Sequence, residues 1–252
     1  MPKMANTQTA AYALTVADLL RKQAGTRAHA VALQDARGVL SYGELDRAAS
    51  RLAQAMLVRG LRAGDRVAVL SENCREYLQL QLAAAKIGVA VACLNWRLAD
   101  AELTHCLRLV SPIMVFVSAR YAPTLARIGH GVAQVILIET QFDAFLAGVL
   151  EDDPRIDVDP EQGLVILYTS GTTGLPKGAV ISQRAMVARA MCFAAQYGIG
   201  PEHSYVAWSP LFHMAATDFS LATLMIGGKV IVQDGLDVDR LCATLERETI
   251  GW

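Results

Sequence analysis

Helical and extended hydrophobic patterns alternate along this chain, with short polar connections between them. The clearest helix signal begins at Ser41, which has capping-box spacing with Glu44 and is followed by apolar residues at helical spacing from Leu45 to Met56. Gly60 offers that helix a left-handed end. Further helices are predicted at 76–87, 101–109, 183–197 and 238–248. Short apolar runs predict strands at 66–70, 89–94, 113–117, 135–138, 164–168, 205–208 and 229–232.

End signals support several of these helices. Gly88 follows the helix at 76–87, Ser182 is a candidate N-cap for the helix at 183–197, and Gly198 follows it. Strands that alternate with helices through short connections are typical of parallel sheets covered on both faces. The predicted fold class is therefore α/β, with layered, largely parallel sheets flanked by helices.

One acidic segment interrupts this alternation. Residues 151–162 read EDDPRIDVDPEQ, with two prolines and few apolar side chains, and we interpret them as an exposed connector. We predict a first α/β subdomain at 1–150 and the start of a second at 163–252. Residues 249–252 look like a turn that enters another buried strand, so we expect the chain to be the N-terminal part of a longer protein.

Composition narrows the functional classes. Hydrophobic residues make up 53% of the 252 residues, which argues against disorder, and the net charge of −1 gives no reason to expect a nucleic-acid partner. The five cysteines lack CxxC spacing and predict reduced, buried thiols and a cytoplasmic location. The first nine residues lack an apolar signal core, and the apolar runs are too interrupted to predict a transmembrane segment.

The segment that carries candidate chemistry is 168–178, YTSGTTGLPKG. Gly171 and Gly174 allow left-handed backbone angles and close approach of a ligand, the four serine and threonine residues carry hydroxyl groups, and Lys177 follows. Successive backbone N–H groups in such a turn form a nest for an anion. Because the loop follows a predicted buried strand, it lies at the sheet edge where α/β proteins bind ligands. These features predict a phosphate-binding loop.

Three other interpretations of this segment are weaker. A flexible surface turn has no need for this concentration of hydroxyls, glycines and a lysine directly after a core strand. A Walker A loop ends in Gly-Lys-Ser/Thr, whereas here Pro176 precedes Lys177 and Gly178 follows it. A dinucleotide fingerprint needs GxGxxG, whereas two residues separate Gly171 from Gly174.

At these residues the chain resembles the adenylate-forming superfamily, which includes acyl-CoA synthetases, aryl-CoA ligases, luciferases and the adenylation domains of peptide synthetases. Segment 168–178 is similar to the phosphate-binding signature of that family over its full length. Other segments resemble family motifs in the same order: LSYGEL at 40–45, GDRV at 64–67, GVAVACLNWRL at 88–98 and SPLFH at 209–213. The resemblance extends from about residue 14 to the end of the chain.

The resemblance implies an ATP-dependent reaction in which a carboxylate attacks the α-phosphorus, pyrophosphate leaves, and a thiol such as coenzyme A takes the acyl group. It implies phosphate contacts from seven loop residues: Thr169, Ser170, Gly171, Thr172, Thr173, Gly174 and Lys177. Implied cofactors are ATP, Mg²⁺ and coenzyme A. Because the family's metal-binding carboxylate is expected beyond residue 252, no metal ligand and no complete catalytic set is assigned within this chain.

The same resemblance implies a substrate pocket for a carboxylic acid at His213, Met214 and Ala215. His213 would shape and polarise that pocket. Trp208, Ala216 and Asp218 flank it, with packing or, for Asp218, a helix cap as the alternative. The other histidines have no comparable context and are interpreted as surface or packing residues: His29, His105, His130 and His203. Gln183 departs from the family pattern, which commonly has a histidine there.

Two alternatives to a fatty or aromatic acid–thiol ligase stay open. In an amino-acid adenylation domain, an aspartate usually follows the position of His213, whereas Met214 stands here. The chain could also be a non-catalytic nucleotide-binding fragment. An NAD-dependent dehydrogenase is the weakest reading because the glycine fingerprint is absent. We expect the chain alone to be inactive or to retain only weak phosphate binding, and the sequence leaves self-association open.

Overall fold

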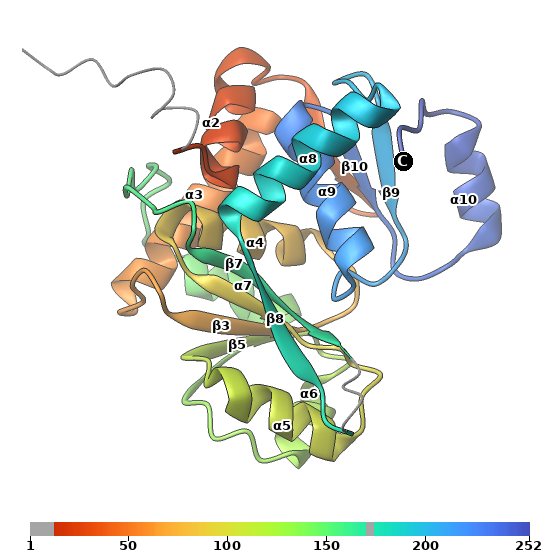
Figure 1. The fold of residues 1–252 in the computed structure, drawn as a ribbon. Coiled ribbons are helices and arrows are strands. Elements are labelled where there is room, and N and C mark those ends of the chain that lie inside the picture. Colours follow the sequence, from red (N-terminus) through yellow and green to blue (C-terminus); the bar gives the residue numbers. More distant parts are fainter. Residues whose placement is uncertain (1–12, 170–173) are drawn as a thin grey trace, which may run out of the picture.

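The computed structural model describes residues 13–169 and 174–252, which form two β-sheets with helices between and around them (Figure 1). The strands are β1 (Val31–Asp35), β2 (Gly38–Ser41), β3 (Arg66–Leu70), β4 (Ala90–Cys93), β5 (Met114–Val117), β6 (Gln134–Leu137), β7 (Gly163–Thr169), β8 (Lys177–Ser182), β9 (Ser204–Ala207) and β10 (Lys229–Val232). The helices are α2 (Val16–Thr26), α3 (Tyr42–Val58), α4 (Arg75–Ile87), α5 (Asp100–Val110), α6 (Ala122–Arg127), α7 (Ile138–Leu146), α8 (Gln183–Tyr197), α9 (Met214–Ile226) and α10 (Val238–Leu245).

The larger sheet has the strand order β6-β5-β3-β4-β7-β8 and is parallel except for the antiparallel pair β7–β8. Its central strands are buried on both faces because their side chains alternate between two cores. Val67 belongs to the core shared with α3 and α4, whereas its neighbour Ala68 belongs to the smaller core under α5 and α6. This arrangement confirms the predicted parallel sheet with helices on both faces.

The second sheet has the order β2-β1-β10-β9, in which β1, β10 and β9 are parallel and β2 is antiparallel. Helix α4 packs against strands of both sheets, and its residues from Glu76 to Ile87 are all buried. A helix without a solvent face must satisfy its polar side chains inside the protein. The candidate site lies at the edge where the carboxyl ends of strands from both sheets meet.

Several predicted helix ends are confirmed at the level of single hydrogen bonds. Ser41 and Glu44 form the predicted capping box of α3, and Gly60 has a φ of +92°. The Ser182 side chain accepts from Ala185 N at the start of α8, and Gly198 closes that helix with a φ of +65°. The structure also contains elements that the sequence analysis did not propose: α2, β1, β2, α6, α7, β8 and α9.

The acidic segment 151–162 is irregular, as predicted, but it is anchored to the fold. The Asp153 carboxylate accepts from Arg21 and Lys86, and Val158 is 8% exposed. Both sheets combine strands from either side of this segment, since β7 pairs with β4 and β10 pairs with β1. The predicted division into 1–150 and 163–252 therefore does not coincide with the division between the sheets. A strand that is apolar on both faces carries no sequence signal for which strand it will pair with, so these pairings could not be predicted from the sequence.

The last residues run alongside β9. Ile250 forms an isolated parallel bridge with Ser204, and the Trp252 ring stacks on Phe219. Helix α10 stands at the edge of the structure and buries none of its residues (Figure 1). Across the described parts of the chain, every helix is too short or too polar to cross a lipid bilayer.

Candidate functional site

The predicted phosphate loop closes a β-hairpin. Thr169 ends β7 and lies directly opposite Lys177, which begins β8, and both side chains are exposed. Ser170, Gly171, Thr172 and Thr173 lie outside the described residues. Gly174 has a φ of +98° with nothing within 4 Å of a Cβ placed there, so its conformation requires glycine while its surroundings stay open.

Helix α5 packs against this hairpin. His105 Nε2 lies 3.1 Å from the carbonyl oxygen of Pro176, the residue before Lys177. The Tyr168 hydroxyl donates to the carbonyl oxygen of Cys106 at 3.2 Å. His105 is thus a support of the loop that sequence analysis missed. No local pattern could reveal it, because the two partners are 71 residues apart and meet only through the fold.

The predicted pocket residues lie at the start of α9. His213 is the N-cap residue of that helix, and its backbone N–H donates to the carbonyl of Pro210 at 2.9 Å. His213 is exposed to solvent, but partial desolvation and the positive charge of Arg97 lower the pKa of its imidazole, which favours the neutral ring at physiological pH. A neutral imidazole can accept one hydrogen bond and donate another.

A cavity of about 400 Å³ joins these two predicted groups. Its lining contains Asn95, Leu98, Glu102, Tyr168, Thr169, Gly174, Pro176 and His213. The structure thus brings Thr169 and Gly174 of the hairpin together with His213, the N-cap residue of α9, and α9 packs against β9 and β10 of the other sheet. This volume lies within the range of sites for small ligands.

Other predicted residues lie outside the described lining of this cavity. Met214 packs against the main core, and Ala215 is exposed. Ala216 is fully buried, so its role is packing. Asp218 is 2% exposed within α9 and accepts from Arg189 of α8 at 2.7 Å, which shows that it is not a helix cap. Trp208 lines a neighbouring cavity of about 290 Å³.

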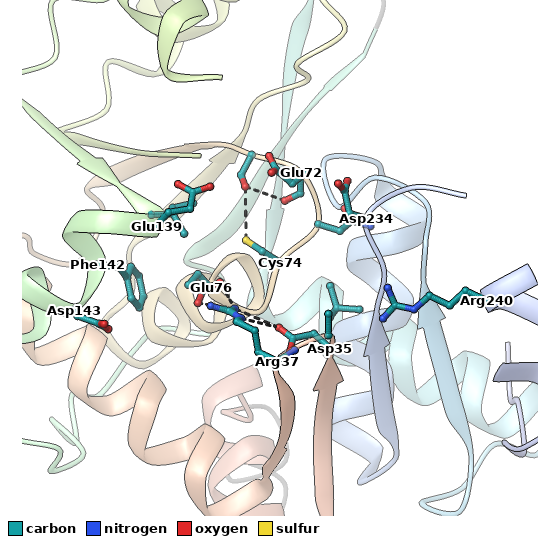
Figure 2. Close-up of a pocket in the computed structure, with 15 residues that line it drawn as sticks. Asp35, Arg37, Glu72, Cys74, Glu76, Glu139, Phe142, Asp143, Asp234 and Arg240 are labelled. Carbon is teal, nitrogen blue, oxygen red and sulfur yellow. Dashed lines mark hydrogen bonds and ion pairs between the residues drawn. The ribbon is translucent and has the colours of Figure 1, made fainter. Parts of the chain in front are cut away.

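A second cavity of about 400 Å³ lies between the sheets and is rich in charged side chains (Figure 2). Part of this charge is paired: Arg37 forms ion pairs with Glu76 at 2.8 Å and with Asp35, and Asp35 also pairs with Arg75 outside the lining. Cys74 faces it, but burial raises the pKa of that thiol to about 12, which leaves it neutral and a poor nucleophile. The ion pairs among Asp35, Arg37 and Glu76 favour a structural role for that part of the cavity.

The chemistry available at the first cavity suits an anion. Thr169 offers a hydroxyl and Gly174 an accessible backbone in the cavity lining, which also contains the carboxyl group of Glu102. Lys177 carries a positive charge opposite Thr169 at the hairpin neck, outside that lining. Among residues 13–169 and 174–252, no three His, Cys, Asp or Glu side chains are grouped to hold a metal ion. The Thr169 hydroxyl and the open backbone at Gly174 are groups that can contact an anion.

Comparison with known proteins places this geometry in a family. The model of the AMP-binding enzyme family matches residues 20–252. A feruloyl-CoA synthase of an Amycolatopsis species is 30% identical over 224 residues, covering 88% of this chain and 44% of the relative. A fatty acid–[acyl-carrier-protein] ligase of Streptomyces coeruleorubidus is 35% identical over 151 residues, covering 59% of this chain and 29% of the relative. The chain thus spans less than half the length of these curated relatives.

Solved structures agree with this assignment. The N-terminal domain of FACL13 from Mycobacterium tuberculosis matches with a TM-score of 0.85 and 26% identity, over 91% of this chain and 59% of that one. ATP-bound MatB from Rhodopseudomonas palustris matches with a TM-score of 0.82 and 27% identity, over 94% of this chain and 48% of that one. The fold, the order of the motifs and the family match together show that this chain belongs to the AMP-binding enzyme family.

Proposed function

We propose that this chain is the nucleotide- and acid-binding part of an ATP-dependent acid–thiol ligase, an AMP-forming acyl-CoA synthetase. The observation that carries the proposal is the shared cavity of Thr169, Gly174 and His213. The cavity lies between the neck of the hairpin and the His213 ring, and this arrangement supports a reaction between the phosphates of a nucleotide and a carboxylic acid. The relatives support the same reaction class, since their names describe ligases of acids with coenzyme A or a carrier protein.

In the proposed reaction, a carboxylate oxygen bonds to the α-phosphorus of ATP while the bond to the bridging oxygen breaks and pyrophosphate leaves. The thiol sulfur then bonds to the acyl carbon, AMP leaves, and the thiol proton is released. The residues of this chain act by position and charge. Thr169 donates to a phosphate oxygen, Gly174 lets phosphate approach the backbone, and Lys177 offsets its negative charge. Ser170, Gly171, Thr172 and Thr173 are proposed to complete the loop.

His213 is proposed to border the acid next to the reacting carboxylate, with Met214 and Ala215 beside it. The apolar Met214 favours a fatty or aromatic acid over an amino acid, whose ammonium group needs an anionic partner. The acceptor is proposed to be coenzyme A. Mg²⁺ is proposed to share the phosphate charge, with its carboxylate ligands outside this chain. All five cysteines are free, which supports the proposed cytoplasmic location, but Cys192 and Cys242 are exposed, so the prediction of buried thiols was wrong for these two.

The decisive experiment is ATP–pyrophosphate exchange with ferulate, palmitate and phenylalanine as separate acids. It is run on this chain and, where the reading frame continues past Trp252, on the longer polypeptide. Exchange with ferulate or palmitate that is lost in Lys177→Met supports the proposal. Exchange with phenylalanine alone would indicate an amino-acid adenylation domain. Absence of exchange in both polypeptides, with ATP binding retained, would indicate a non-catalytic nucleotide-binding protein.

A further inference from the structure

The side chain of Asn73 connects the two sheets beside the candidate site. It follows the carboxyl end of β3 and is 8% exposed. Its amide nitrogen lies 2.9 Å from the carbonyl oxygen of Ala207, 2.8 Å from that of Ser209 and 3.1 Å from that of Gln233. Its amide oxygen accepts from the backbone N–H of Leu211 at 2.8 Å. Ala207 ends β9, Ser209 and Leu211 lie in the turn that follows it, and Gln233 follows β10, so all four partners lie at the carboxyl ends of strands of the other sheet or just beyond them.

Thr217 holds the opposite side of the same turn. Its hydroxyl donates to the carbonyl oxygen of Leu211 at 2.6 Å and accepts from Gln81 of α4 at 3.2 Å. Both Thr217 and Gln81 are fully buried. The backbone of Leu211 is therefore fixed through its N–H by Asn73 and through its carbonyl by Thr217. Leu211 comes two residues before His213, whose own carbonyl accepts from the Thr217 backbone at 3.2 Å.

These hydrogen bonds bear on how the two halves of the candidate site are held at a fixed separation. Thr169 and Gly174 belong to the hairpin of the six-stranded sheet, whereas His213 follows the end of the four-stranded sheet. Their separation depends on contacts that cross between the sheets. Hydrophobic packing is non-directional and fixes such a separation loosely, whereas buried hydrogen bonds are directional and costly to leave unpaired. We propose that Asn73 and Thr217 are positioning residues that fix the turn at 208–213 and thereby set the place of His213 in the cavity.

The inference rests on the proposed function for its catalytic meaning, but the positioning itself can be tested without any ligand. NMR titration of the ring carbon-bound protons of the five histidines reports the pKa of His213 in this chain. The charged and titratable groups that share its surroundings are Arg97, Glu102 and Tyr168. Because partial desolvation and Arg97 lower the pKa of His213, a ring released from its place should titrate at a higher pH than in the wild type.

Thr217→Val keeps the size of the side chain but removes its hydroxyl, and we expect it to raise the titration midpoint of His213. Thr217→Ser keeps the hydroxyl and should restore the wild-type midpoint. Asn73→Ala should shift the midpoint in the same upward direction. If Asn73→Ala fails to fold, the Thr217→Val and Thr217→Ser pair still decides the question.

Thr223→Val is the matched control. Thr223 is 1% exposed on the same helix and makes the same kind of bond, to the carbonyl oxygen of Phe219 at 2.7 Å, but at the end far from His213. It should lower the thermal midpoint like Thr217→Val while leaving the His213 titration unchanged. A His213 midpoint unchanged in Thr217→Val would overturn the inference. If the His213 signals of the wild type do not change when ATP and ferulate are added, this result would count against the proposed function. It would not affect the inference that Asn73 and Thr217 position His213.

Discussion

Lys86 and Lys177 carry the same charge in opposite surroundings. The Lys86 side chain is 0% exposed, and its Nζ lies 2.7 Å from both Asp46 and Asp153. Lys177 is exposed at the hairpin neck and makes no ion pair with another described residue. A buried charge is tolerated only when partners compensate it, whereas an exposed, unpaired cation at the edge of a cavity remains available to a ligand. The comparison separates charges that hold the fold from charges that the candidate site can use.

The largest expected effect comes from removing the buried charge. Lys86→Met should lower the free energy of unfolding by about 3 kcal/mol, because it leaves Asp46 and Asp153 beside each other without their shared cation. Urea denaturation followed by circular dichroism measures this loss. Lys22→Met changes an exposed lysine and should stay within about 0.5 kcal/mol of the wild type. Equal stability of the two variants would contradict the structural role of Lys86.

Asp153 provides the next test, through pH. Burial alone would raise its pKa, but hydrogen bonds from Arg21 and Lys86 hold the pKa of this carboxyl well below its usual range. Its contribution to stability is therefore present above the unfolded-state pKa of about 3.9 and is lost as the pH falls below it. Asp153→Asn should cost about 2 kcal/mol at neutral pH, with the difference from wild type shrinking below about pH 4. Urea denaturation at a series of pH values measures this, and a pH-independent difference would contradict it.

The sequence predicted the parts of the fold that depend on local signals. The capping box at Ser41 and the glycine end at Gly198 were recognisable because each involves residues within one helical turn. Helix α9 was missed because MAATDFSLATLMI is buried on nearly all sides and shows no polar face. Strand β8 was missed because it directly follows the loop motif and exposes apolar residues such as Val180, which is 61% exposed.

The candidate site was predictable in composition but not in geometry. Resemblance to a family identified Thr169, Gly174 and His213 as site residues, and the structure places these three around one cavity. Their approach depends on how β7 and β9 fall into two different sheets, which no local pattern encodes. The supports from His105 and Asn73 were invisible for the same reason, since their partners are separated from them by 71 residues or more. Long-range polar contacts are therefore the feature of a site that is hardest to predict from sequence.

Lys177 should respond in the opposite way to Lys86. Lys177→Met should weaken ATP binding by about tenfold, the loss expected for one charge-assisted contact, while the free energy of unfolding stays within about 0.5 kcal/mol. Isothermal titration with ATP at low and high salt measures the effect, which should shrink as salt screens the charge. Lys22→Met is again the control and should bind like the wild type. A Lys177→Met variant that loses stability but binds ATP normally would show that Lys177, like Lys86, serves the fold rather than the candidate site.

The smallest expected effect is on Gly174, and it tests whether the hairpin neck contributes to ATP binding through its backbone as well as through the Lys177 charge. Gly174→Ala places a side chain at a φ of +98°, a conformation that costs about 1 kcal/mol for a residue with a Cβ, although the space around it is open. Gly60→Ala meets the same conditions, with a φ of +92° and nothing within 4 Å, but follows α3 outside the cavity lining. Both variants should lose similar stability in urea denaturation, whereas only Gly174→Ala should weaken ATP binding. Equal ATP affinity in the two variants would mean that Gly174 is needed only for the conformation of the turn. Of the two described residues tested at the hairpin neck, Lys177 alone would then keep a supported role in ATP binding.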